Sequence, residues 1–270
     1  MNIKFPSKNL HLKTTRASNK SLKVVITGAS QGLGKAMTNK FIESGDKVFV
    51  ISRNASDIDK MVNEHKNIYG HPADVGNSKH IEPLFDKIQV AFDGEVDLFL
   101  NCAAQSGGYG VMDELDDNKI SSIIQTNLLG TSLCCKYAYD IMKGQESGGA
   151  IFNFLGNGSS GHSTPHYAIY GSTKAAIKQL THSLQREWSE STVDLHLISP
   201  GLMITDLLTE NLSKETFEFI RNMCSTPEIV AHHIVPRMRS TYYSARDDTT
   251  IKFLTVMKIM YKMMSQNFVQ

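Results

Sequence analysis

Short apolar runs rich in β-branched residues alternate with segments of helical periodicity along most of this chain. The apolar runs predict strands at 22–27, 47–52, 96–101, 149–155 and 193–199, with a weaker strand near 68–70 and a last one near 250–255. The periodic segments predict helices at 32–45, 56–65, 78–92, 114–143 and 168–190. Repeated strand–helix units with short connections produce a parallel sheet with helices on both faces. We therefore expect an α/β fold with a single Rossmann-like, doubly wound parallel sheet.

Length and composition agree with one domain of this class. The chain has 270 residues, of which 41% are hydrophobic, and it contains no linker, repeat or low-complexity block. We expect a basic tail at 1–21 and one nucleotide-binding domain at 22–270, in which 202–250 forms an excursion that builds the substrate pocket. The Met-rich segment 253–268 is compatible with a final strand and helix, with a dimer surface or with contact to a membrane surface.

Charge and cysteine usage exclude several classes of protein. The formal net charge is +1, so no overall field predicts nucleic-acid binding. No apolar run reaches the ~18 residues that a membrane span requires. The four cysteines are not spaced as metal ligands, and this indicates reduced thiols in an intracellular compartment and no metal site.

The first 23 residues differ from the rest because they carry six basic residues and no acidic one. A basic start with serine and threonine is typical either of an organelle transit sequence or of a short disordered tail. The sequence leaves both interpretations open.

A glycine loop lies directly between the first predicted strand and the first predicted helix. It reads TGASQGLG and spans Thr27 to Gly34, with glycines at 28, 32 and 34. Glycine allows positive φ and close backbone approach, and a helix N-terminus there can receive a pyrophosphate. This context predicts a dinucleotide site rather than a plain turn.

The end of the second predicted strand indicates which dinucleotide is bound. A carboxylate there would bind the ribose 2′-hydroxyl of NAD. The chain instead has Ser52 followed by Arg53, and a guanidinium suits a 2′-phosphate. We therefore expect NADPH, with NADH as the less favoured cofactor, while Arg53 as a solvated turn residue is the alternative.

Tyr170 and Lys174 are four residues apart in a predicted helix, so both side chains lie on one face. A phenol has a reference pKa of about 10 and is a poor base at neutral pH. A neighbouring ammonium lowers that pKa, and Tyr170 can then exchange a proton with a carbonyl oxygen. Chance packing of a tyrosine on a lysine stem is the alternative explanation.

Six motifs together resemble those of the short-chain dehydrogenase/reductase family. They are TGASQGLG, ADV at 73–75, NCAAQ at 101–105, TNLLG at 126–130, YGSTK at 170–174 and SPGLMITD at 199–206. The resemblance implies hydride exchange between a nicotinamide and a carbonyl, with Tyr170, Lys174 and Asn127 in catalysis. It implies cofactor binding by Gly28, Ser30, Gly32, Leu33, Gly34, Arg53, Asp74, Val75, Asn101, Ala103, Tyr170, Lys174, Pro200, Gly201 and Thr205.

The chain departs from the family pattern at two places that matter for catalysis. The usual NNAG is Asn-Cys-Ala-Ala at 101–104, and the usual serine, thirteen positions before the tyrosine, is Asn157. Either Asn157 donates its amide to the substrate oxygen, or the loop is reshaped and Ser159 takes that role. We favour Ser159 because the glycines around it leave the loop free to bring it inward. A loop without a polarising group is the third alternative.

A narrower resemblance is carried by 151–180 and by SPGLMITDLL with TPEIVAHHIVPRMR, which look like the chlorophyll b reductase branch of that family. This implies NADPH-dependent reduction of the 7-formyl group of chlorophyll(ide) b and a chloroplast location, with the cytoplasm as the alternative. The rival functions are reduction of a 3-oxoacyl or steroid-like carbonyl and an inactive nucleotide-binding scaffold. The family also implies a homo-oligomer, and contact with a thylakoid surface is left open.

Overall fold

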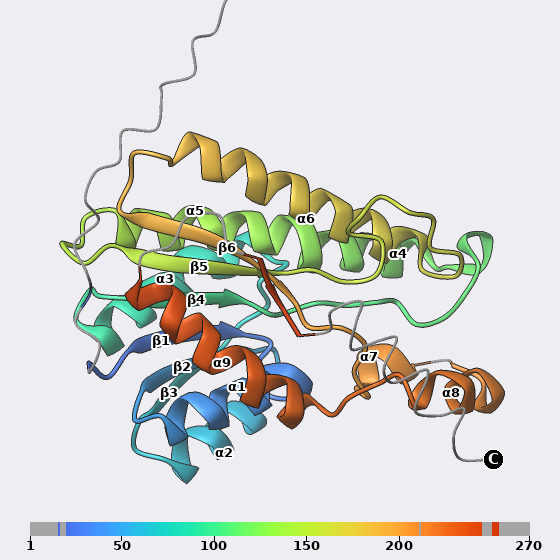
Figure 1. Cartoon of the computed structure of the whole chain (residues 1–270), viewed down its shortest axis with the longest axis horizontal. Helices are drawn as coiled ribbons and strands as arrows, with labels where there is room; N and C mark the ends of the chain where they lie inside the picture. The colour runs from blue at the N-terminus through green and yellow to red at the C-terminus, as the bar shows by residue number, and fades with distance from the viewer. Residues whose placement is uncertain (1–15, 17–19, 211, 245–249, 254–270) are drawn as a thin grey trace, which may run out of the picture.

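The computed structural model describes residue 16 and residues 20–210, 212–244 and 250–253. Within them, seven strands form one sheet in the order β3-β2-β1-β4-β5-β6-β7, and every neighbouring pair is parallel (Figure 1). The strands are β1 (Lys23–Thr27), β2 (Lys47–Ser52), β3 (Ile68–Pro72), β4 (Leu98–Asn101), β5 (Gly149–Phe154), β6 (Val193–Ser199) and β7 (Thr250–Lys252). The predicted doubly wound α/β fold is confirmed, and the chain reverses its winding direction between β1 and β4.

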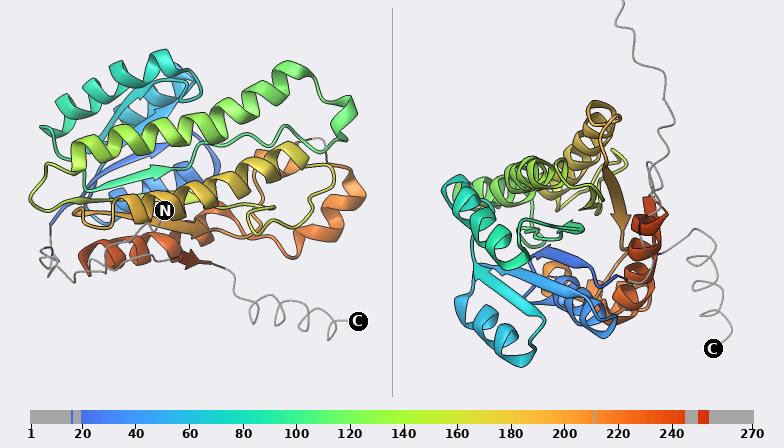
Figure 2. Two further views of the ribbon diagram at one scale, coloured as in Figure 1. Left: turned by 90° about the horizontal axis from the view of Figure 1, so that it is seen from above. Right: turned by 90° about the vertical axis from the view of Figure 1, so that its left-hand side faces the viewer.

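Helices cover both faces of the sheet (Figures 1 and 2). One face packs against α1 (Gly32–Glu43), α2 (Ala55–Glu64) and α9 (Pro227–Tyr243). The other face packs against α3 (Ser78–Phe92), α5 (Thr131–Met142) and α6 (Ala168–Glu187). The strands are therefore buried from both sides, which explains why they are almost continuous apolar runs in the sequence.

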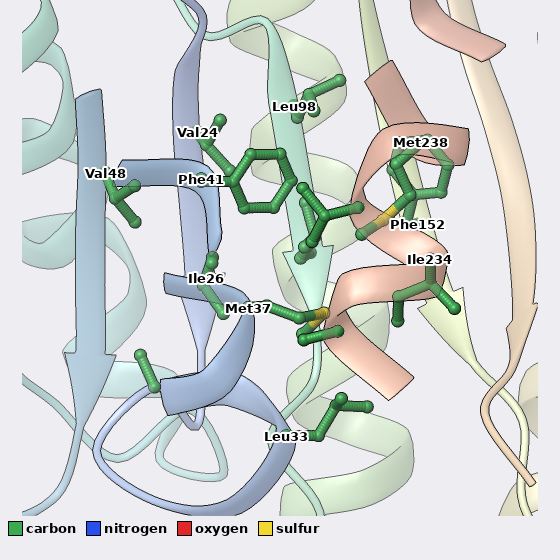
Figure 3. Packing of buried hydrophobic residues seen from close by; sticks show 14 of the residues in the cluster. Val24, Ile26, Leu33, Met37, Phe41, Val48, Leu98, Phe152, Ile234 and Met238 are labelled. Carbon is green, nitrogen blue, oxygen red and sulfur yellow. The ribbon is translucent and has the colours of Figure 1, made fainter. Parts of the chain in front are cut away.

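The first hydrophobic cluster joins α1 and α9 to the middle of the sheet. Figure 3 shows Met37 and Phe41 of α1 beside Ile234 and Met238 of α9, all of them fully buried. Burial of each such side chain stabilises the fold by roughly 1.5–3 kcal/mol. This packing anchors the end of the predicted excursion against the helix that begins at the glycine loop.

The long helix predicted at 114–143 is interrupted. The structure has a short 3-10 turn η1 (Met112–Glu114), the helix α4 (Asp117–Ile124), a π-helical turn η2 (Gln125–Gly130) and then α5. The Asp116 side chain accepts hydrogen bonds from the first backbone amides of α4, which explains where α4 begins. π-helical turns are frequent at functional sites, and this one contains Asn127.

The described residues of the predicted excursion at 202–250 contain two short helices, α7 (Asp206–Thr209) and α8 (Lys214–Arg221), followed by α9. A single bridge between Met203 and Ser225 closes it at its base. It lies beyond the carboxyl end of β6, as the sequence predicted. The Met-rich segment lies almost entirely outside the described residues. No helix in the described part of the chain is long and apolar enough to cross a membrane.

Arg16 belongs to the predicted tail, yet its side chain is bound at the amino ends of the strands and is only 7% exposed. Its Nε donates to the Ser147 carbonyl oxygen at 2.7 Å, and one terminal nitrogen lies 3.2 Å from the Asp194 carboxylate. The guanidinium also lies over the Tyr242 ring, 4.2 Å from its centroid. Residue 16 is thus part of the fold, while the division of the chain at residue 21 otherwise stays a prediction.

Candidate active site

The glycine loop lies at the carboxyl end of β1, at the switch point between β1 and β4. Gly28 has a φ of +68°, and a Cβ there would lie 2.8 Å from the Cα of Ala103. A Cβ on Gly34 would lie 2.1 Å from the carbonyl oxygen of Gly28. Only glycine fits at both positions, so the backbone forms a tight cradle that a diphosphate can approach closely.

The N-terminus of α1 faces this cradle without a side-chain cap, because Gln31 at the N-cap position makes no capping hydrogen bond. Its first amides are therefore available to an anion. Thr205 faces the same helix end, with its methyl carbon 3.4 Å from where a Cβ of Gly32 would lie. A cavity of about 390 Å³ opens beside them along α1, and neither Tyr170 nor Lys174 lines it. The residues that fit a diphosphate are therefore the glycine cradle and the first amides of α1.

The carboxyl ends of β2 and β3 border the same edge of the sheet. Arg53 follows β2 and its side chain is exposed, with no carboxylate beside it at that strand end. Asp74 follows β3, where its side chain accepts a hydrogen bond from the Gly76 amide at 2.9 Å, and Val75 is buried. The parallel pairing of β1, β2 and β3 thus puts Arg53, Asp74 and Val75 at the same edge of the sheet as the glycine loop, and their role in binding a cofactor stays a prediction.

Tyr170 and Lys174 lie on one face of α6, one turn apart. The Lys174 Nζ is 5.7 Å from the centroid of the Tyr170 ring and donates to the Phe154 carbonyl oxygen at 3.0 Å. Lys174 is 4% exposed, and burial lowers the pKa of its ammonium to about 8. The ammonium is therefore still charged at neutral pH, although it lies in the interior.

The predicted effect on the tyrosine is wrong for the free protein. The sequence predicted that the ammonium lowers the pKa of Tyr170, but burial raises that pKa above its usual value, and neighbouring Tyr167 and Cys102 raise it further. The physical reason is that desolvation of a phenolate exceeds the attraction of a cation that is itself engaged with a carbonyl oxygen. Tyr170 is thus held as a neutral phenol, which is the form that donates a proton.

Asn127 connects three parts of the site from the π-helical turn. Its amide nitrogen donates to the Gln105 carbonyl oxygen at 2.9 Å and to the Thr173 hydroxyl at 3.0 Å. Its oxygen accepts from the Gln105 amide at 2.8 Å. The turn therefore holds the loop after β4 in place against the helix that carries Tyr170.

The loop after β5 carries both candidates for the polarising group and lies against Tyr170 at Gly156. A Cβ on Gly156 would lie 2.3 Å from the Tyr170 hydroxyl, so this backbone lies directly against it. Ser159 donates to the Gly156 carbonyl oxygen at 2.7 Å and accepts from the Gly156 amide at 2.9 Å. Asn157 is exposed, and its oxygen lies 3.1 Å from Nε2 of His162. Ser159 is thus the candidate that is bonded to the backbone lying against the Tyr170 hydroxyl.

Asn101 and Ala103 take different positions after β4. The Asn101 side chain is buried and donates to Asn153 of β5 at 2.8 Å, so its amide is engaged inside the sheet. The Ala103 amide donates to the Thr27 hydroxyl at 3.0 Å, beside Gly28. Between them lies Cys102, and burial raises the pKa of its thiol to about 12. Ala103 thus borders the cradle. Because the Asn101 side chain is already bonded, only its backbone could make the predicted contact with the cofactor.

The remaining predicted residues lie in the glycine loop, in the first turn of α1 and directly after β6. Ser30 is half-buried in the glycine loop, and the Leu33 side chain packs in the core, which leaves its backbone for a ligand. Pro200 is buried just after β6, and Gly201 follows it with a φ of +76°. The described residues contain no group of three histidine, cysteine or acidic side chains that would hold a metal ion.

Sequence reasoning missed a cluster of four rings formed by His166, Tyr109, Tyr167 and Tyr170, called here the ring cluster. His166 and Tyr109 are stacked with centroids 4.2 Å apart, and Tyr167 contacts Tyr109 and Tyr170 edge-on at 5.7 Å and 6.3 Å. The Tyr167 hydroxyl oxygen is buried and has no hydrogen-bond partner in the structure. The only sequence signal is the aromatic HYAIY at 166–170, which does not reveal Tyr109.

The chain belongs to the short-chain dehydrogenase family. The sequence model of that family, described as short chain dehydrogenase, matches residues 22–216. The fold is shared with 3-ketoacyl-(acyl-carrier-protein) reductase from Brucella melitensis in complex with NADH, at 20% identity and a TM-score of 0.77, over 87% of this chain and 97% of that one. It is also shared with a serine dehydrogenase in complex with NADP+, at 23% identity and a TM-score of 0.76, over 87% and 96%. The likeness to these two structures shows the fold, and the match of residues 22–216 shows the family.

Two plant proteins are more similar in sequence. The probable chlorophyll(ide) b reductase NYC1, chloroplastic, of Oryza sativa is 35% identical over 260 residues, which cover 88% of this chain and 50% of that protein. The chlorophyll(ide) b reductase NOL, chloroplastic, of the same species is 34% identical over 256 residues, which cover 90% and 74%. The chain spans about half the length of the first of these relatives. The predicted resemblance to chlorophyll b reductases is confirmed.

Proposed function

We propose that this protein is an NADPH-dependent carbonyl reductase that reduces the 7-formyl group of chlorophyll(ide) b to a hydroxymethyl group. The observation that carries the proposal is the arrangement of Tyr170 and Lys174 beside an uncapped helix N-terminus and a glycine cradle. The similarity to two chlorophyll(ide) b reductases supports the choice of substrate.

In this proposal the side chains supply the proton and the bound nicotinamide supplies the hydride. The neutral phenol of Tyr170 donates its proton to the carbonyl oxygen as that oxygen becomes an alcohol. The Lys174 ammonium holds the ribose hydroxyls of the cofactor and stabilises the phenolate that Tyr170 leaves behind. Ser159 polarises the carbonyl by giving up its bond to Gly156 for one to the substrate oxygen. Asn127 positions the loop after β4.

The preference for NADPH is part of the proposal. Arg53 is exposed at the end of β2, where a 2′-phosphate would accept its guanidinium hydrogen bonds. Gly28, Gly32 and Gly34 with the N-terminus of α1 would hold the diphosphate, and Thr205 would reach the carboxamide. A chloroplast location, suggested by the names of the relatives, and a homo-oligomeric state also stay proposals.

The test is anaerobic incubation of the purified protein with chlorophyllide b and NADPH, followed by chromatography of the pigment. We expect the 7-hydroxymethyl product with the wild type and none with Tyr170→Phe. NADPH oxidation by simple aldehydes without any pigment product would leave a reductase of another carbonyl, such as a 3-oxoacyl or steroid-like compound. Binding of NADPH without oxidation by any aldehyde would indicate an inactive scaffold.

A further inference from the structure

The Tyr167 hydroxyl is the polar group that the proposed reaction leaves unused. Its oxygen is buried and unpartnered. Buried tyrosine hydroxyls normally find a hydrogen-bond partner, and an unsatisfied one destabilises the structure. The free protein therefore carries a cost at this position that a bound ligand with a suitable acceptor would remove.

The position of Tyr167 relates this hydroxyl to the substrate rather than to the cofactor. Tyr167 is the N-cap residue of α6, three residues before Tyr170. Their ring edges are in contact, and Tyr167 also contacts Tyr109 of the loop after β4. The Tyr167 ring thus lies between the proton donor and this loop, where the body of a substrate would extend.

Three segments distant in sequence meet around Tyr167. The Tyr109 amide donates to the Glu210 carbonyl oxygen at 3.2 Å, and the Gly110 amide donates to the His166 carbonyl oxygen at 3.3 Å. Lys119 of α4 reaches over to the Glu210 carboxylate at 3.1 Å. Burial raises the pKa of the Tyr167 hydroxyl, and Tyr109 and Glu210 add to this effect. Tyr167 is therefore a hydrogen-bond donor throughout the neutral pH range.

The loop that carries Tyr109 also exposes large hydrophobic side chains beside the ring cluster. They are Val111 and Met112, with exposed fractions of 37% and 47%. Ligand sites are typically apolar and aromatic with a few convergent polar groups. Rings and aliphatic side chains with a single buried donor suit a large, flat, conjugated ring system that carries an oxygen.

We propose that the ring cluster is the recognition subsite for the conjugated ring of the substrate, and that the Tyr167 hydroxyl donates a hydrogen bond to an oxygen of that ring other than the reacting one. The proposal rests on the proposed pigment reductase activity. In it, Tyr170 handles the reacting carbonyl, and Tyr167 determines which carbonyl compounds are placed there.

The test compares the wild type with Tyr167→Phe, which keeps the ring and removes only the hydroxyl. Chlorophyllide b affinity is measured by fluorescence in the presence of NADP+, and kcat and KM are measured with chlorophyllide b and with butanal, which is too small to reach the ring cluster. We expect Tyr167→Phe to raise the Kd and KM for chlorophyllide b about tenfold, with kcat and butanal reduction unchanged. Tyr139→Phe is the matched control. The Tyr139 ring stacks on Trp188, with their centroids 4.0 Å apart, outside the ring cluster, so this variant should change none of these values.

A second readout needs no substrate. Because Tyr167→Phe removes an unpartnered buried hydroxyl, the thermal midpoint of the free protein should rise relative to Tyr139→Phe. Unchanged chlorophyllide b affinity in Tyr167→Phe, or a lower thermal midpoint, would overturn the proposal.

The two proposals fail in different ways. Wild-type protein that binds chlorophyllide b without reducing it contradicts the reaction, and the affinity of Tyr167→Phe then still decides the subsite. Equal kcat and equal KM for chlorophyllide b in the wild type and in Tyr167→Phe would contradict the subsite alone. Failure of the wild type to bind chlorophyllide b would overturn both.

Discussion

At the amino ends of the strands, the buried Arg16 guanidinium lies against the Asp194 carboxylate and several carbonyl oxygens, and the Tyr242 hydroxyl donates to Asp97 at 2.6 Å. At the carboxyl ends, the buried Lys174 ammonium donates to one carbonyl oxygen, and the Tyr167 hydroxyl donates to nothing. Both ends bury polar groups. At the amino ends these groups are satisfied within the protein, and at the carboxyl ends part of their bonding capacity is left for a ligand.

This difference indicates that the polar groups at the amino ends stabilise the fold and that those at the carboxyl ends bind ligands. A satisfied buried network stabilises and specifies a structure, whereas a partly satisfied one costs free energy. The protein accepts that cost beside Tyr170, where open donors and a glycine cradle are needed. Substitutions at the amino ends should therefore act on stability, and substitutions at the carboxyl ends on binding and turnover.

The largest effect is expected for Tyr170→Phe, which removes the proton donor and keeps the ring. We expect carbonyl reduction to fall by about 10²–10⁴-fold, because that is the usual contribution of a positioned acid. The urea midpoint should stay at its wild-type value, measured by circular dichroism. A large loss of stability in this variant would break the contrast between the two ends.

Arg16→Ala should have the largest effect on stability. Removing one partner of a buried ion pair typically costs about 3–5 kcal/mol, and the Asp194 side chain is only 1% exposed. We expect the free energy of unfolding in urea to fall by about this amount, while kcat at low temperature is kept. The free energy of unfolding of Arg16→Lys should lie between those of the wild type and Arg16→Ala, because a lysine keeps the charge but loses the forked hydrogen bonds. A wild-type urea midpoint for Arg16→Ala would show that the tail residue is dispensable.

NADPH affinity should depend on pH through Lys174. Its ammonium has a pKa of about 8, whereas the pKa values of the neighbouring Tyr170 and Cys102 are both raised, so those two groups stay neutral. The charged form is present below about pH 8 and is lost above it. We therefore expect the Kd for NADPH to rise between pH 7 and pH 10, by at most about tenfold per pH unit above the pKa. Lys174→Met should bind weakly with a flat pH profile, and a wild-type Kd that is flat over this range would contradict the assignment.

Arg53→Ala should have the smallest effect, because the side chain is exposed and its interaction with a phosphate is screened by salt. We expect the ratio of NADPH to NADH affinity to fall about tenfold at low ionic strength, with NADH affinity unchanged. Lys47→Ala, at the exposed amino end of the same strand, is the control. Equal weakening of both cofactors by Arg53→Ala would assign Arg53 to general electrostatics rather than to the 2′-phosphate.

Much of the fold could be predicted because the strands are buried on both faces. KVFVIS and GAIFNF are largely apolar runs, and each forms a strand with a neighbour on both sides in the sheet. The apolar periodicity of 114–143 did not predict the interruption near Asn127. Asn127 in this turn bonds to Gln105 and Thr173, which come from other parts of the chain and are not visible in the local sequence.

The candidate site shows the same limit. The spacing of Tyr170 and Lys174 predicted that they are neighbours, and this is confirmed. Spacing could not predict that burial raises the pKa of Tyr170, since desolvation depends on everything packed around the phenol. Likewise, the roles of Arg16 and Tyr167 depend on partners more than 50 residues away along the chain.

The most direct test of the account is to follow the hydride itself. Chlorophyllide b is incubated anaerobically with NADPH deuterated at the transferred position of the nicotinamide, and the pigment product is analysed by mass spectrometry. The account predicts a 7-hydroxymethyl product that carries one deuterium on the new CH₂OH carbon with the wild type, and no product with Tyr170→Phe. Unreduced pigment with the wild type, or equal labelled product from Tyr170→Phe, would contradict it.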